Sequence, residues 1–171
     1  MLRHGPALGL LALAALLAFA ASSAAQTQDT ATPPRPAEGD IHDKARRLWD
    51  AIVRDDPALA ADVFFPREPF LQIKNMRDPG RYYDKLRARF DADIHALHAS
   101  TPDLDRATFE RLELAKRGGY VRVREEGNRL PYWASRHSRL HYRVGKALRS
   151  IEVRVIIAWQ DAWYVIHLSP L

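Results

Sequence analysis

The sequence predicts an α+β domain, in which two or three N-terminal helices pack on a curled antiparallel sheet of about five strands. Apolar residues recur at helical spacing as far as Thr101-Pro102, and from Thr108 onward they alternate with a period of two. Short turn signals separate the alternating stretches, which favours strands joined by hairpins. The 171 residues are enough for one domain of ordinary size.

Residues 1–25 have the layout of a secretory signal peptide. A short basic start precedes an apolar run of mostly Ala and Leu over Ala7–Ala20. Ser23 and Ala25 then stand at the −3 and −1 positions of an expected cleavage site before Gln26. The run is short for a membrane span, so an uncleaved anchor is the less favoured alternative. We expect export to the periplasm or the cell exterior, with no transmembrane segment after cleavage.

Residues 26–39 are expected to form a flexible linker, and residues 40–171 a single α+β domain. The linker contains Pro33, Pro34 and Pro36 and no large apolar residue, a composition typical of an extended tether.

The first half of the domain is expected to be mainly helical. One helix runs from the cap residue Asp40 to near Arg54, and Asp56-Pro57 starts a short second helix. Glu68–Lys74 is interpreted as a short extended or irregular piece. The longest helix is expected over Pro79–His98, where an apolar stripe recurs every three or four residues.

The second half is expected to be an antiparallel meander. Its predicted strands are Phe109–Lys116, Tyr120–Arg124, Tyr132–Tyr142, Leu148–Ala158 and Ala162–Leu168. Gly118-Gly119 is predicted to join the first two strands as a hairpin, Val144–Lys146 the next pair, and Gln160-Asp161 the last pair. The last strand is apolar on both faces, which favours a central strand covered on both sides.

The residue inventory excludes several chemistries. There is no cysteine, so lipid attachment through an N-terminal Cys, disulfides and thiolate metal sites are excluded. There is no nucleophile elbow, phosphate loop or glycine fingerprint, and no cofactor is expected. Enzymatic activity therefore has no support from motifs.

Positive charge is concentrated late in the chain. Between Asp40 and Asp105 there are 11 Lys/Arg and 13 Asp/Glu, a balance of −2; between Arg106 and Arg154 there are 13 and 5, a balance of +8. A basic half can meet an anionic envelope polymer or an acidic small molecule. The alternative is an ordinary solvated strand surface. Nucleic acid is disfavoured as a partner, because export is expected and no binding motif is present.

A candidate metal site lies on the longest predicted helix. Asp91, His95 and His98 follow one another at spacings of four and three, which places them on one strip of the helix. Imidazoles and a carboxylate are ligands for zinc or another divalent ion. A solvated helix edge explains the same pattern.

Candidate ligand-binding residues lie on the third predicted strand. His137 and His141 are expected on the same side as Trp133 and Arg139, and this face could line a pocket for an anionic or aromatic ligand. Pro131 restricts the chain before the strand, so that Tyr132 points to the face opposite Trp133. An exposed sheet face is the alternative.

The last predicted strand holds two further candidates, Trp163 and His167. Both stand between apolar neighbours, so each has a core-packing explanation as well as a pocket-lining one. In a pocket, His167 could act together with Tyr83.

Several short motifs together resemble a family of exported bacterial proteins that has no established activity. They include F-F-P at Phe64–Pro66, Lys74, N-R-L-P-Y-W at Asn128–Trp133 and W-x-x-x-W-Y-V-x-H-L at Trp159–Leu168. The resemblance implies an envelope or extracellular location and supplies no catalytic residues. The predicted architecture resembles the NTF2-like cone and, less closely, the cystatin-like fold, in which a pocket lies between the sheet and the long helix.

The sequence therefore favours a non-enzymatic exported domain that binds a small ligand or a partner protein. The alternative is a metal-dependent or His-based enzyme of the hydrolase type in an NTF2-like pocket. A third hypothesis is a structural module whose arginine-rich strands contact an anionic envelope polymer.

Overall fold

The computed structural model describes residues 32–168, and the predicted signal peptide lies outside them. Within this range, three α-helices and two short 3-10 turns precede five strands. The helices are α1 (Ile41–Arg54), α2 (Arg67–Ile73) and α3 (Pro79–Ser100). The strands are β1 (Ala107–Glu113), β2 (Gly118–Val121), β3 (Tyr132–Val144), β4 (Ala147–Trp159) and β5 (Ala162–His167). No helix in the described part is long and apolar enough to cross a membrane.

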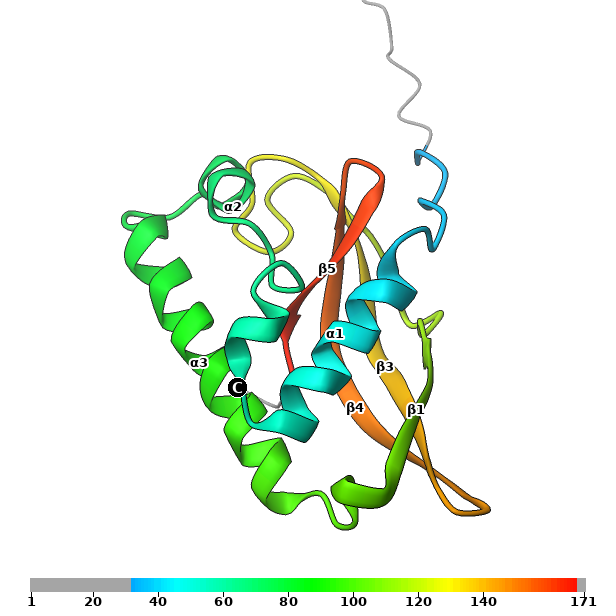
Figure 1. Ribbon diagram of the computed structural model, residues 1–171. Coiled ribbons are helices and arrows are strands. Elements are labelled where there is room, and N and C mark those ends of the chain that lie inside the picture. The colour runs from blue at the N-terminus through cyan, green and yellow to red at the C-terminus, as the bar shows by residue number, and fades with distance from the viewer. Residues whose placement is uncertain (1–31, 169–171) are drawn as a thin grey trace, which may run out of the picture. The chain divides into compact units, whose positions relative to one another are not determined.

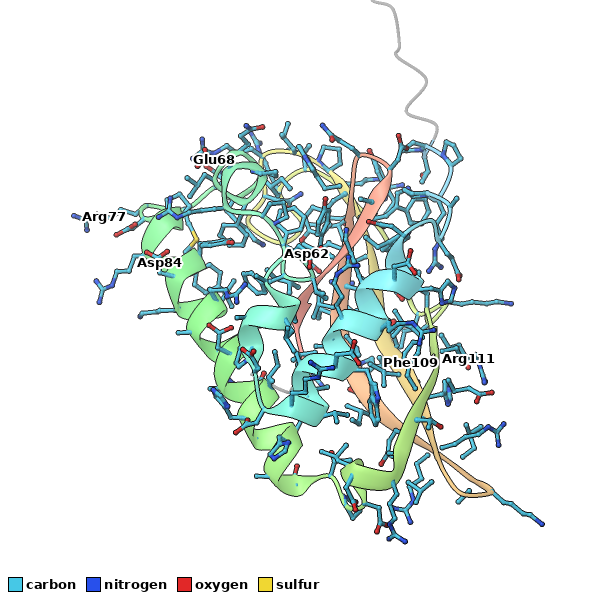
Figure 2. The ribbon with its side chains drawn as sticks, in the orientation of Figure 1. Asp62, Glu68, Arg77, Asp84, Phe109 and Arg111 are labelled. Atoms are coloured by element: carbon cyan, nitrogen blue, oxygen red, sulfur yellow. The ribbon has the colours of Figure 1, made fainter. Side chains whose placement is uncertain are left out.

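The structure confirms the predicted α+β fold, with helices packed on a curled antiparallel sheet of five strands. The sheet order is β1-β3-β4-β5, and β2 also pairs with β3. In Figure 1, α1 lies in front of the sheet and α3 runs along its β5 side. Charged side chains such as Arg77, Asp84 and Arg111 project away from the packed layers (Figure 2).

The two longer helices lie where the apolar periodicity predicts them. Helix α1 buries Ile41, Leu48 and Ile52 on one face and ends where Asp55 adopts a left-handed conformation. Helix α3 begins at Pro79, and the Asp78 side chain accepts a hydrogen bond from the Arg81 backbone N–H at 2.9 Å. A carboxylate at this position satisfies an otherwise unpaired helix N–H, so the cap-and-proline pair is a dependable start signal.

The prediction of a short extended or irregular piece at Glu68–Lys74 is wrong, because this segment forms most of α2. Pro66 holds the chain extended at the N-cap, and Glu68 lies in the first turn, where a negative charge is favourable. Phe70 and Ile73 are both buried, three residues apart on one helical face. A helix of seven residues repeats this spacing only once, which is too little to outweigh the flanking proline in a sequence pattern.

The prediction of a hairpin turn at Gly118-Gly119 is also wrong. Strands β1 and β2 do not pair with each other; both pair with β3, β1 along Arg139–Val144 and β2 along Tyr132–Ser135. The two glycines lie inside β2. Gly118 has φ +119° and faces Ala134 so closely that a Cβ would collide with the Ala134 carbonyl. The glycine pair therefore permits a close approach of strands and does not form a turn.

Strand β5 is covered on both faces, as predicted, but it is the last strand of the sheet and not a central one. Its outer edge still finds partners, because the Val165 N–H donates to Val63 O at 2.9 Å and Val165 O accepts from the Phe65 N–H at 3.0 Å. Trp163 and Val165 are buried, and so is Ile166 on the other face. The segment preceding α2 thus takes the place of a further strand.

Strand β3 changes the direction of its side chains midway. His137 has φ +62°, and the hydroxyls of Ser135 and Ser138 lie 3.0 Å apart on one face. Strict alternation would put these two serines on opposite faces. Trp133 therefore shares a face with Ser138, and the prediction that it lies on the same side as Arg139 and His141 is wrong.

The segment Thr32–Gly39 has no helix or strand, yet it contacts the sheet. Trp163 Nε1 donates to Ala37 O at 2.9 Å, and the Arg35 guanidinium lies 5.2 Å from the centre of the Trp163 ring. Arg35 also donates to Ala115 O at 3.3 Å. The compact unit thus begins at Thr32 and includes part of the predicted linker.

Candidate functional site

A cavity of about 160 Å³ lies between α2, α3 and the end of the sheet formed by β3, β4 and β5. Its apolar walls come from the two helices and from β4 and β5: Phe70, Tyr82, Leu86, Val155, Ile157 and Ile166. Its polar lining consists of Lys74, Glu126, Tyr132, Arg136 and His167. An apolar cavity of roughly 150 Å³ is large enough for benzene. The size therefore suits a molecule built on one ring or a short branched chain.

Lys74 stands at the C-cap of α2, where a bridge to Asn128 fixes its backbone. Its ammonium donates to Glu126 O at 3.3 Å and lies 5.9 Å from the centre of the Tyr132 ring. Burial lowers the pKa of Lys74, and the nearby Glu126 carboxylate partly offsets this by raising it. A cation in a partly dry site gains more from an anionic neighbour than one in water does.

Glu126 connects the polar groups of the cavity. Its carboxylate accepts a hydrogen bond from the Tyr132 hydroxyl at 2.6 Å and another from the Arg136 guanidinium. Burial raises the pKa of Tyr132, and the hydrogen bond to Glu126 raises it further. Tyr132 therefore remains a neutral donor near pH 7. Both oxygens of Glu126 are engaged within the protein.

The loop that carries Glu126 is organised by Asn128, which is fully buried. The Asn128 amide donates to Arg122 O at 2.9 Å and to Leu130 O at 2.8 Å, and its Oδ1 accepts from the Glu126 N–H at 3.0 Å. The Arg129 N–H donates to Ile73 O at 2.6 Å, which ties the loop to α2. Asn128 thus fixes Glu126 and Tyr132 relative to Lys74.

His167 lies at the end of β5 opposite Val155 of β4 and lines the same cavity. Burial lowers the pKa of its imidazole; the buried Asp93 carboxylate acts in the opposite direction, and Lys74 adds to the lowering. The imidazole is therefore neutral near pH 7 and can donate or accept one hydrogen bond to a bound molecule.

The lowered pKa of His167 predicts a loss of stability in acid. The folded protein binds a proton at His167 less readily than the unfolded chain, whose pKa is near 6.5, so the stability contribution falls as pH drops below that value. We expect His167→Gln to flatten the decline of the free energy of unfolding between about pH 7 and pH 5. Urea unfolding at several pH values measures this. Parallel curves for His167→Gln and the parent would contradict it; exposed His42→Gln is the control.

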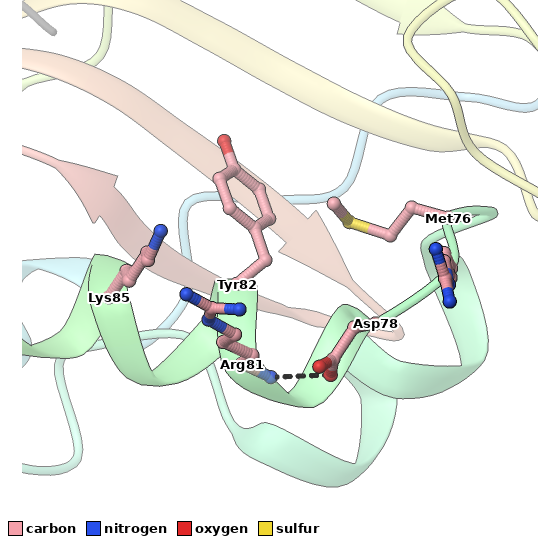
Figure 3. Close-up of a pocket in the computed structure, with 6 residues that line it drawn as sticks. Met76, Asp78, Arg81, Tyr82 and Lys85 are labelled. Carbon is pink, nitrogen blue, oxygen red and sulfur yellow. Dashed lines mark hydrogen bonds between the residues drawn. The ribbon is translucent and has the colours of Figure 1, made fainter.

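A second, open groove of about 350 Å³ lies outside the cavity, at the start of α3. Arg77, Arg81 and Lys85 line it, with Met76, Asp78 and Tyr82. In Figure 3, Tyr82 stands between Lys85 and Met76, and the dashed line marks the capping bond of Asp78. Tyr82 lines both the groove and the cavity. The groove and the cavity therefore share the half-buried Tyr82 side chain.

The structure places two of the predicted ligand-binding residues, Tyr132 and His167, in the cavity. Trp163 is fully buried in the core, and Trp133 lines a different groove, formed with Tyr120, Trp159 and the prolines of the N-terminal segment. The other three lie elsewhere on β3. His137 contacts Glu152 at 2.9 Å, His141 contacts Glu113 at 3.1 Å, and Arg139 is exposed.

The three candidate metal ligands on α3 each have a different partner. Asp91 pairs with Arg87 at 2.9 Å, His95 with Asp55 at 2.6 Å, and His98 Nδ1 lies 2.9 Å from Ile52 O. Across residues 32–168, no group of three or more His, Cys, Asp or Glu side chains is arranged to hold a metal ion.

Sequence reasoning missed Lys74, Glu126 and Arg136 as site residues. They come from the end of α2, the loop before β3 and β3 itself, so no local spacing joins them. The signal that was available is the pair Asn128 and Pro131, which marks a structured loop directly before Tyr132. Comparison with known proteins found no matching family model, no matching curated protein and no matching solved structure.

Proposed function

We propose that this protein is an exported, non-enzymatic domain that binds a small molecule in the cavity between α2, α3 and the sheet. The observation that carries this proposal is the composition of the cavity. Six apolar or aromatic side chains form its walls, and its five polar side chains include the linked group Lys74, Glu126 and Tyr132. Ligand sites in proteins have this composition, with few polar groups that fix orientation.

The positions of the lining residues favour binding over hydrolysis. The cavity lining contains no serine, threonine or aspartate among the described residues, and the Tyr132 hydroxyl already donates to Glu126. Tyr83, the partner considered for His167, does not line the cavity; its hydroxyl donates to Phe65 O at 3.0 Å. Among the described lining residues, His167 thus has no serine or threonine hydroxyl beside it to activate.

Export is the second part of the proposal, and it rests on the basic, apolar and small-residue segments of residues 1–25. A fusion of these residues to a reporter that functions only outside the cytoplasm tests it. We expect reporter activity from the parent, and loss of that activity when charged residues interrupt Ala7–Ala20. Equal activity from both fusions would contradict export by a signal peptide.

Binding is tested by nuclear magnetic resonance titration with three one-ring molecules: benzene, benzamide and benzoate. We expect at least one of them to shift the resonances of Leu86, Ile157 and Ile166 at millimolar concentration or below. Val155→Phe, which adds volume at the cavity wall, should remove the shifts, whereas the same substitution at exposed Val123 should leave them unchanged. The absence of shifts with all three molecules would contradict the proposed function.

A further inference from the structure

The charges around the cavity identify the class of its ligand, provided that the proposed function holds. We infer that the ligand is a compact organic monoacid, with an apolar body of about one ring and a carboxylate held by Lys74. The inference rests on three observations: the unmet hydrogen-bonding capacity of Lys74, the charge balance of the lining, and the cationic groove beyond Tyr82.

Lys74 can donate further hydrogen bonds to a molecule in the cavity. An ammonium group carries three N–H donors, and within residues 32–168 its one hydrogen-bond acceptor is Glu126 O, at 3.3 Å. The Glu126 carboxylate accepts from Tyr132 and Arg136, and among the described residues no hydrogen bond joins it to Lys74. A carboxylate brought in by a ligand would satisfy the remaining donors of Lys74 with charge-assisted hydrogen bonds, which are roughly twice as strong as neutral ones.

The lining carries an excess of one positive charge. Lys74 and Arg136 are cations, Glu126 is the one carboxylate among the described lining residues, and Tyr132 and His167 are neutral near pH 7. A single carboxylate would neutralise this excess. A dianion would leave a net negative charge in a partly buried site, which is unfavourable, and a cation would meet like charge. The balance therefore favours a monoanion.

The positively charged groove beyond Tyr82 also favours a negatively charged ligand. Arg77, Arg81 and Lys85 are exposed there, and Asp78, the one carboxylate among the described groove residues, is engaged as the helix cap. A cluster of like charges beside a cavity raises the local concentration of oppositely charged molecules. Tyr82 lines both the groove and the cavity, so an anion held in the groove lies next to the cavity that Lys74 lines.

The apolar walls determine the rest of the ligand. Phe70, Leu86, Ile157 and Ile166 are buried and present no hydrogen-bonding groups, so the body of the acid must be apolar there. An acid carrying further hydroxyl groups on that side would lose hydrogen bonds to water without replacement. Aromatic and short branched-chain monocarboxylates fit this description.

The test compares benzoate with benzamide, which have the same shape and differ in charge. We expect calorimetry on the chain lacking residues 1–25 to show benzoate binding about tenfold more tightly than benzamide at low salt. Lys74→Met keeps the apolar stem and removes the charge, so it should abolish this preference while leaving benzamide binding within about twofold. Lys146→Met, at the exposed β3–β4 turn, should change neither affinity.

A second variant measures the contribution of the groove. Replacing both Arg81 and Lys85 with glutamine should weaken benzoate binding about two- to threefold at low salt and leave benzamide binding unchanged. Before each titration, a nuclear magnetic resonance spectrum of the backbone amides checks that the variant is folded.

The outcomes separate the two proposals. Equal affinity for benzoate and benzamide would overturn the monoacid inference and leave the small-ligand function standing. A benzoate preference that persists in folded Lys74→Met would overturn the assignment of the carboxylate to Lys74. Failure of benzene, benzamide and benzoate alike would overturn both the inference and the function on which it rests.

Discussion

Replacing Asn128 with alanine is expected to lower the free energy of unfolding by about 3 kcal/mol, because three hydrogen bonds are lost and their partners remain in a buried loop. The groups left without Asn128 are Arg122 O, Leu130 O and the Glu126 N–H. Alanine also leaves the volume of the amide empty at a position with no solvent exposure. Urea unfolding of the variant and the parent measures the difference.

The same substitution should also weaken ligand binding in the protein that remains folded. Without Asn128 the loop no longer fixes Glu126 against Tyr132, so the polar end of the cavity loses its arrangement. Asn75→Ala is the matched control, because Asn75 lies beside this loop, is exposed, and contributes its backbone N–H to Gly127 O. A loss below about 1 kcal/mol for Asn128→Ala would show that the loop does not depend on its side chain.

Lys44→Ala is expected to cost about 3 kcal/mol, since it removes the cation that joins α1 to β5. Lys44 is only 4% exposed. Its ammonium donates to Trp163 O at 3.0 Å, pairs with Asp40 at 2.9 Å and lies 3.5 Å from the centre of the Tyr164 ring. Removal leaves the Trp163 carbonyl without this donor and opens space beneath the Tyr164 ring. Thermal and urea unfolding measure the effect.

Comparison with Lys44→Met separates charge from packing. Methionine fills most of the volume of the lysine stem, and Asp40, whose side chain is 47% exposed, can be hydrated again once its partner is gone. We therefore expect Lys44→Met to recover at least half of the loss seen in Lys44→Ala. Lys146→Ala is the exposed control and should be neutral. Equal losses in both Lys44 variants would show that the charge itself carries the stability.

The sequence alone predicts those helices and strands correctly whose apolar spacing repeats several times along the chain. Helix α3 and the β3–β4–β5 meander follow from apolar periodicity and from turns at Gly145-Lys146 and Gln160-Asp161, which the strand pairing confirms. The sequence pattern does not predict α2, because its seven residues repeat the helical spacing only once. The glycine pair at 118 and 119 is compatible both with a turn and with a close strand contact, and only the position of Ala134 decides between them.

The sequence predicts only some of the residues that line the cavity, because the others are brought together by contacts between distant parts of the chain. Tyr132 and His167 stand out because each is a polar residue next to apolar strand residues. Lys74, Glu126 and Arg136 become neighbours only when the loop before β3 binds the end of α2, and this depends on long-range hydrogen bonds such as that from the Arg129 N–H to Ile73 O. Contacts of this kind leave no periodic trace in the chain.

The left-handed backbone conformation of His137 affects how this protein can change over evolutionary time. Because the side-chain phase of β3 shifts there, Tyr132 and Arg136 line the cavity, whereas Leu140 and Tyr142 lie on the other side of the shift in the core. The Tyr142 ring stacks on Trp49 of α1 with the ring centres 4.9 Å apart. One strand therefore serves two separate packing environments. Under the proposed binding function, substitutions in its first half would alter ligand preference while the residues that support α1 stay unchanged, so ligand specificity and folding stability would vary independently.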